Sequence, residues 1–177
     1  MPLPISGAAH EARPGSDFLW FVYGSSLDRD AFRAWAGEHG YDVPDFSRAA
    51  AARLEGWRLC FDVVSRFWGG AVGSLAAAPG ARVEGLAVPM PGTARGLADH
   101  KEGAISGLYR PMDVSVVPLA GGEPIGAAAY VASPGRRLAA EQAPSPAWLD
   151  SVIRGAQAAG LSPEWIAELL RLRGRLP

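Results

Sequence analysis

Short apolar runs separated by turn residues occupy most of the chain. Residues 18–23 are continuously apolar and aromatic and are followed by Gly24 and two serines, which is typical of a buried strand ending in a loop. Residues 53–64 alternate with a period near two, as a half-buried strand does. Further strands are expected over residues 69–75, 83–90, 107–119 and 124–131. The glycines at 69, 70 and 73 indicate that another group approaches this backbone closely.

Helix signals occupy the remaining segments. Asp28 can cap a helix that runs to about residue 38. A short helix opens near residues 91–93 and closes at Glu102, because Gly103 suits the position after a helix. Towards the end of the chain, a serine cap followed by proline occurs at 145–146 and again at 162–163. These patterns predict an α+β fold: a small mixed, largely antiparallel β-barrel or sheet of six strands, with peripheral helices and two C-terminal helices.

Composition narrows the class of protein. With 177 residues, 49% of them hydrophobic, the chain can bury one good core, which excludes wholesale disorder. We expect residues 1–16 to be a flexible tail without a signal peptide and residues 17–177 to be a single domain. The net charge of −1 lacks the basic excess of a nucleic-acid binder. No window is long and apolar enough for a membrane span, so a cytoplasmic protein is expected.

Two features could carry chemistry. The small residues Gly24, Ser25 and Ser26 lie between a strand and a helix, where free backbone N–H groups suit a carboxylate or a developing oxyanion. Glu102 lies at a helix C-terminus, where the helix dipole disfavours its negative charge and raises its pKa, as a proton acceptor needs. Each feature alone also fits an ordinary turn or a solvated helix end, with Asp99 and Lys101 as surface charges.

Other chemistry is poorly supported. Cys60 is a single cysteine in an apolar stretch and fits a small core residue, without an internal disulfide. His39 and His100 lack a metal-binding spacing, so no metal site is expected. The six tryptophans are expected mostly in the core.

Several motifs in order resemble the γ-glutamylcyclotransferase family, over about residues 18–172. The opening strand runs into a family-like segment, Tyr23-Gly24-Ser25-Ser26-Leu27. Family-like strand segments follow, among them Leu59-Cys60-Phe61-Asp62, Trp68-Gly69-Gly70 and Val83-Glu84-Gly85 with Met90. An acidic signature is present as Glu102-Gly103 with Gly107 and Tyr109. The C-terminal Ala143-Pro144-Ser145-Pro146 segment and its two helices fit the same pattern.

The resemblance implies a cofactor-independent enzyme that converts a γ-glutamyl amide into 5-oxoproline and a free amine. It implies a single catalytic domain over residues 17–177, with Glu102 as the general acid and base and no metal or cofactor. It also implies that Tyr23, Gly24, Ser25, Ser26, Leu27 and Tyr109 bind the substrate. The expected partner is a small γ-glutamyl compound, not nucleic acid or a membrane, and a homodimer is left open.

The sequence departs from the family at two places. Ser26 replaces the asparagine of the loop motif, and a hydroxyl cannot make all the hydrogen bonds of an amide. Ala139 and Ala140 stand where some members carry another pocket tyrosine. In the loop before them, Arg136 or Arg137 could bind a substrate carboxylate, although a solvated pair is the favoured expectation. Two alternatives therefore stay open: removal of a γ-glutamyl protecting group from a biosynthetic intermediate, and a binding protein of the same fold without turnover.

Overall fold

Five strands close into a barrel in a computed structural model that describes residues 15–176. The order around the barrel is β1-β3-β2-β4-β5. The strands are β1 (Phe18–Val22), β2 (Ala50–Ser65), β3 (Gly70–Met90), β4 (Tyr109–Pro118) and β5 (Ile125–Ala132). All neighbouring pairs are antiparallel except β1 and β5, which pair in parallel at Trp20 and Ala128. The predicted mixed, largely antiparallel barrel is therefore confirmed, while most of the predicted tail, residues 1–14, lies outside the described residues.

The expectation of six strands was wrong, because residues 69–75 and 83–90 belong to one continuous strand, β3. The segment between them pairs with β2 at both of its ends, as at Trp57–Ala77 and Glu55–Arg82, and residues 78–81 lie at a register shift between these pairs. Gly56 and Gly80, with φ values of 78° and 82°, adopt the left-handed region at this shift. These glycines let the two strands bend at a bulge, after which the pairing resumes.

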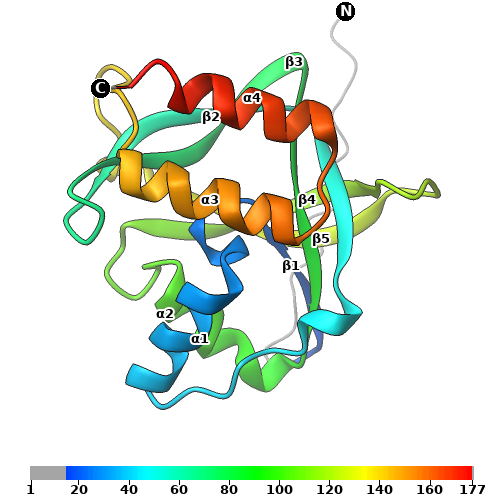
Figure 1. Ribbon diagram of the computed structural model, residues 1–177. Coiled ribbons are helices and arrows are strands. Elements are labelled where there is room, and N and C mark those ends of the chain that lie inside the picture. Colours follow the sequence, from blue (N-terminus) through cyan, green and yellow to red (C-terminus); the bar gives the residue numbers. More distant parts are fainter. Residues whose placement is uncertain (1–14, 177) are drawn as a thin grey trace, which may run out of the picture.

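Residues 15–176 also form four α-helices, which pack on one face and at one end of the barrel (Figure 1). They are α1 (Arg29–Glu38), α2 (Arg95–Lys101), α3 (Pro146–Ala158) and α4 (Pro163–Arg173). The predicted caps are present: Ser145 Oγ accepts from the Trp148 N–H at 3.3 Å, and Ser162 Oγ accepts from the Trp165 N–H at 3.2 Å. The helix expected from residues 91–93 begins as a 3₁₀ turn, η3 (Gly92–Ala94), before α2.

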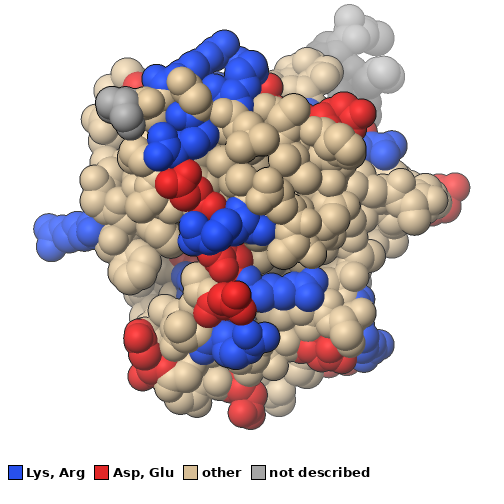
Figure 2. Space-filling model, in the orientation of Figure 1, with Lys and Arg blue, Asp and Glu red and all other residues tan. Residues whose placement is uncertain are grey.

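Helices α3 and α4 lie side by side along one face of the barrel, while α1 and α2 lie together at one end (Figure 1). On the face formed by α1, α3 and α4, basic and acidic side chains alternate (Figure 2). Several of them form ion pairs, including Arg173–Asp150 and Arg171–Glu168. Of the helices that the structure describes, none is long and apolar enough to cross a bilayer.

The glycines of β3 permit the close approach that their pattern predicts. A Cβ atom at Gly73 would lie only 2.4 Å from the ring of Trp148, and one at Gly70 would lie 3.3 Å from Ser145. Both neighbours belong to the start of α3, so this expectation is confirmed. The bare backbone lets the Trp148 indole pack directly on β3, where it forms part of a pocket wall.

Candidate active site

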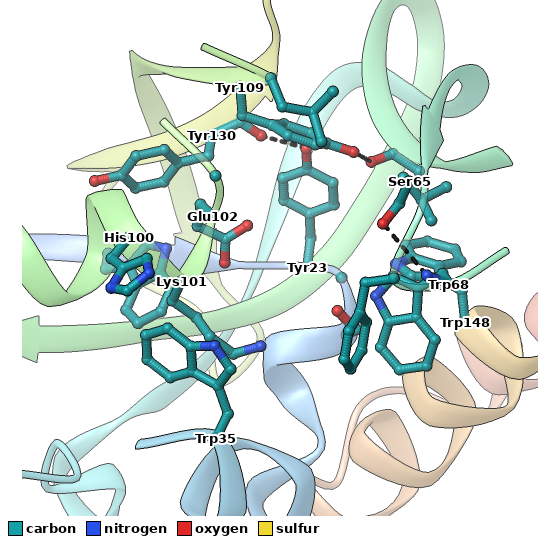
Figure 3. Close-up of a pocket in the computed structure, with 18 of the residues that line it drawn as sticks. Tyr23, Trp35, Ser65, Trp68, His100, Lys101, Glu102, Tyr109, Tyr130 and Trp148 are labelled. Carbon is teal, nitrogen blue, oxygen red and sulfur yellow. Dashed lines mark hydrogen bonds between the residues drawn. The ribbon is translucent and has the colours of Figure 1, made fainter. Parts of the chain in front are cut away.

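A cavity of about 260 Å³ opens at the end of β1, between the barrel, α1 and α2 (Figure 3). Its walls are mainly aromatic and come from segments far apart in the sequence. They include Trp20, Tyr23, Trp35, Phe67, Trp68, Tyr109, Tyr130 and Trp148. The charged residues among those lining it are Lys101 and Glu102, from the end of α2. A largely apolar wall around a few charged groups is the usual form of a small-molecule site.

Glu102 lies in the pocket because of how α2 ends. It is the C-cap residue of the helix, and its N–H donates to the Ala98 carbonyl at 2.9 Å. Gly103 then turns the chain with a φ of 73°, which only glycine adopts without strain. The helix end directs the Glu102 carboxylate into the cavity, where Figure 3 shows it between Tyr130 and Tyr23.

The environment of Glu102 suits a group that takes up and releases a proton. Burial raises the pKa of its carboxyl above the usual range, while the charge of Lys101 and a hydrogen bond from Ser26 oppose that rise. The Ser26 hydroxyl donates to Glu102 Oε1 at 2.8 Å. No partner for Oε2 is recorded among residues 15–176, so this oxygen can face a ligand.

The loop after β1 forms one side of this site. Its residues fold into a 3₁₀ turn, η1 (Ser25–Leu27), with the Leu27 N–H donating to the Gly24 carbonyl at 3.0 Å. Gly24 and Ser25 line the cavity. The first N–H groups of such a turn have no acceptor within the turn itself. They can therefore serve an anionic group in the pocket.

Ser26 and Leu27, the other predicted loop residues, are more deeply buried than Gly24 and Ser25. Ser26 is 3% exposed and reaches the pocket through its bond to Glu102, whereas Leu27 is fully buried in the core. Leu27 does not line the cavity and contacts α3, where a Cβ atom at Gly155 would lie 2.4 Å from its carbonyl carbon. The structure therefore assigns these two residues a supporting position under the loop.

Tyr23 and Tyr109 line the pocket with their rings, while both hydroxyls are already engaged. Tyr109 donates to the Gly73 carbonyl at 2.6 Å, and Tyr23 donates to the Tyr130 carbonyl. Burial raises the pKa of both phenols well above 10, so both remain protonated donors at neutral pH. These tyrosines shape the wall and tie β4, β3 and β5 together around the pocket.

The alternative in which Asp99 and Lys101 are ordinary surface charges beside a solvated helix end does not fit the structure. Asp99 Oδ1 accepts a hydrogen bond from the Tyr130 hydroxyl at 2.5 Å. Lys101 lines the pocket, and its Nζ lies 5.2 Å from the centre of the Trp35 ring. Both residues precede Glu102 on α2, which packs against α1 and β5, so the helix buries them.

Comparisons with known proteins agree with this architecture. Residues 82–169, which include Glu102, match the AIG2-like family. A solved structure named γ-glutamyl cyclotransferase is 25% identical, with 88% of this chain and 87% of that chain covered and a TM-score of 0.69. These matches support a γ-glutamylcyclotransferase-like family for the chain, and its fold supports a γ-glutamylcyclotransferase-type function.

Further solved structures resemble this chain. YkqA from Bacillus subtilis is 26% identical with a TM-score of 0.72, and the match covers 91% of this chain and 55% of that one. A yeast γ-glutamyl cyclotransferase specific to glutathione is 11% identical, covers 90% of this chain and 96% of that one, and has a TM-score of 0.65. At this identity, the likeness shows the fold alone. No curated protein sequence matches the chain.

Sequence reasoning missed several pocket residues of this γ-glutamylcyclotransferase-like protein. Trp35 and Trp68 line the cavity and are only partly buried, although tryptophans were expected mostly in the core. His100 also lines it, with Nδ1 3.1 Å from the Tyr41 hydroxyl. The apolar spacing in α1 could have placed Trp35 on an inward face, but nothing local distinguishes a core wall from a pocket wall.

The arginines of the loop after β5 do not line this pocket. Arg137 donates to Asp62 Oδ2 at 2.5 Å and to the Leu75 carbonyl at 3.1 Å, so it is a structural ion pair and not the solvated residue expected. Arg136 donates to the Ser106 carbonyl at 3.3 Å. Among residues 15–176, no group of three or more His, Cys, Asp or Glu side chains could hold a metal ion.

Proposed function

We propose that this protein is a γ-glutamylcyclotransferase that converts a γ-glutamyl amide into 5-oxoproline and a free amine, with Glu102 as general base and then general acid. The observation that carries this proposal is a partly buried carboxylate with a raised pKa, which accepts a hydrogen bond from Ser26 in the 3₁₀ turn after β1. The similarity to γ-glutamylcyclotransferase-like proteins and the aromatic pocket support it.

The chemistry needs a base because the α-amine of the substrate is mostly protonated at neutral pH. Glu102 takes a proton from this ammonium, and the freed nitrogen attacks the γ-carbonyl carbon of the same molecule. Since nucleophile and electrophile belong to one substrate, holding it in a folded shape supplies much of the rate enhancement. The pocket walls formed by Trp20, Tyr23 and Trp148 suit that task.

The tetrahedral intermediate then collapses. Gly24 and Ser25 line the cavity, and in this proposal the backbone N–H groups of their loop stabilise the oxyanion that forms on the γ-carbonyl oxygen. Glu102 gives the first proton to the leaving nitrogen, and the C–N bond breaks. Glu102 then takes a second proton from the ring nitrogen and passes it to the departing amine, which leaves as an ammonium. The lactam nitrogen keeps the third ammonium proton, and no water is consumed.

A direct assay tests this function. The protein is incubated with γ-glutamyl-alanine and a panel of γ-glutamyl amines, and 5-oxoproline is measured by mass spectrometry. We expect product with the wild type and a loss of about 10²- to 10⁴-fold in kcat for Glu102→Gln, because the amide cannot accept the proton. Glu38→Gln is the control, since Glu38 also ends a helix but is exposed and outside the pocket.

Two outcomes would count against the proposal. If Glu102→Gln forms 5-oxoproline as fast as the wild type, Glu102 is not the proton carrier. If no member of the panel yields 5-oxoproline although a γ-glutamyl compound binds, the protein is a binding module of this fold.

A further inference from the structure

Lys101 is the single lysine of the chain, and its side chain extends below Glu102 into the pocket (Figure 3). Its ammonium lies over two ring faces of α1, 5.7 Å from the centre of Phe32 and 5.2 Å from that of Trp35. Among residues 15–176, no carboxylate lies within ion-pairing distance of it. The pocket therefore contains a positive charge with aromatic neighbours and without an anionic partner.

Lys101 is partly buried, and removing part of a charged group from water costs free energy that an anionic ligand would offset. Burial lowers the pKa of Lys101, and the charges of Glu102 and Asp28 partly offset that effect. Ring faces stabilise a cation only modestly and leave its N–H donors unsatisfied. An anionic group on a ligand would satisfy both the charge and the donors.

The position of Lys101 relative to Glu102 specifies which anion fits. These consecutive residues bring an ammonium and a carboxylate into one cavity. An amino-acid head group has the complementary pair, an ammonium and a carboxylate on one carbon. If Glu102 receives the α-ammonium of a γ-glutamyl group, the α-carboxylate lies only two bonds from that nitrogen and reaches the neighbouring cation.

Resting on the function proposed above, we infer that Lys101 binds the α-carboxylate of the γ-glutamyl group and thereby selects γ-glutamyl amides over amides that carry only the amine. Lys101 lines the same cavity as Gly24 and Ser25 of the loop that we assign to the glutamyl portion. A carboxylate on the leaving group would lie beyond the bond that breaks, farther from this pair.

Matched substrates test the inference. γ-Glutamyl benzylamide and 4-aminobutanoyl benzylamide share the amine and the leaving group, and only the first has an α-carboxylate; the second cyclises to pyrrolidin-2-one by the same steps. For Lys101→Met, we expect kcat/KM to fall about 10- to 100-fold more on the γ-glutamyl compound than on the other, because both amides lose the effect of the Lys101 charge on the pKa of Glu102 and only the first loses a contact to its carboxylate. Lys101→Arg should restore most of the preference, because it keeps the charge.

Three results would overturn it. An equal fall on both amides would indicate a structural role for Lys101. A fall confined to γ-glutamyl-phenylalanine, whose leaving group bears its own carboxylate, would assign Lys101 to the leaving group. No fall on any substrate would show that Lys101 does not contact the ligand.

A binding measurement gives the same comparison without turnover. Because the chain has one lysine, protein labelled with [6-¹³C]lysine yields one lysine Cε signal in NMR spectra. We expect 5-oxoproline to shift this signal and to raise the pKa of Lys101, since a bound carboxylate favours the charged amine. Pyrrolidin-2-one, which lacks the carboxylate, should do neither, and equal responses to the two ligands would contradict the inference.

The two proposals fail separately. If the wild type forms no 5-oxoproline from any γ-glutamyl amide, the proposed function fails, whatever the NMR titration shows. If 5-oxoproline forms normally but Lys101→Met affects both benzylamides equally, only the role of Lys101 is lost.

Discussion

At the scale of single residues, the contact between Ser26 and Glu102 joins the two motifs on which the function depends. Ser26 stands where the family has asparagine, and its hydroxyl donates a hydrogen bond to Glu102 Oε1 at 2.8 Å. This bond favours the ionised carboxylate, whereas burial favours the protonated form. The substitution in the loop therefore acts on the proton carrier itself as well as on the shape of the loop.

A pH profile can measure that effect. The acid limb of kcat/KM should lie above the usual range of a carboxyl group, because Glu102 must be ionised to act as base and burial raises its pKa. In Ser26→Ala the limb should move to still higher pH, since the hydrogen bond that lowers the pKa is gone. Activity should fall several-fold near the limb and recover as the pH rises.

Ser106→Ala is the control for that profile, because its exposed hydroxyl bonds only to the Gly103 carbonyl, at 2.9 Å, in the turn after Glu102. An acid limb that stays in place in Ser26→Ala, or moves to lower pH, would show that Ser26 does not stabilise the carboxylate.

At the scale of elements, α3 holds the site loop in place. Gly155 of α3 touches the backbone of the loop, where a Cβ atom would lie 2.4 Å from the Leu27 carbonyl carbon and 2.5 Å from the Asp28 nitrogen. Asp28 Oδ2 also accepts from Ser151 at 3.0 Å and from Arg154 Nη2 at 2.9 Å, both on α3. The helix and the loop therefore behave as one packed unit beneath the pocket.

Gly155→Ala should weaken that unit. The added methyl group meets backbone atoms that cannot rotate away, so we expect a loss of about 1–3 kcal/mol in the free energy of unfolding. Activity should also fall, by roughly tenfold, because the loop must move. The measurements are urea unfolding and the 5-oxoproline assay.

Gly37→Ala provides the comparison, since Gly37 lies in α1 with open space around its Cα. There, the better helix propensity of alanine should stabilise the protein by about 0.5–1 kcal/mol. If Gly155→Ala stabilised the protein as Gly37→Ala does, the close packing of α3 on the loop would be disproved.

At the scale of the whole molecule, a buried carboxylate attaches the C-terminal helix pair to the barrel. Glu84 of β3 is 1% exposed and accepts from the Ser162 N–H at 2.9 Å and from its hydroxyl at 2.7 Å. Ser162 is also the N-cap of α4. Ser162 therefore caps α4 and also donates hydrogen bonds to the buried Glu84 carboxylate, which offset part of the free-energy cost of burying that group.

Ser162→Ala should cost more than the loss of an ordinary cap. We expect a decrease of about 2–4 kcal/mol in the free energy of unfolding, since a cap contributes about 1 kcal/mol and the loss of the hydroxyl donor to the buried Glu84 Oε1 costs a further 1–3. Among residues 15–176, Oε1 then keeps only Arg82 Nε, at 3.5 Å. Chemical denaturation followed by tryptophan fluorescence would report it.

Ser145→Ala is the matched variant, because Ser145 caps α3 in the same way but donates to a neutral carbonyl, that of Trp68, at 2.7 Å. Its loss should be smaller than that of Ser162→Ala. Equal losses would mean that Glu84 contributes nothing to the attachment of α4.

Local signals in the sequence determined much of this protein. The period of the apolar residues, the Ser-Pro caps of α3 and α4 and the glycine after Glu102 each act within a few neighbouring residues, so the element types and the helix ends could be predicted. The ordered motifs determined the family. The strand count was missed because pairing with β2, not the local pattern of residues 76–82, keeps β3 continuous.

Only the tertiary structure decided which side chains share the pocket. Ser26 and Glu102 are 76 residues apart, and they meet because the closed barrel brings the end of β1 beside the end of α2. Lys101 and Asp99 resemble surface charges until α2 packs against α1 and β5. Contacts at such separations depend on how the strands pair and close, and this information is distributed over the whole chain.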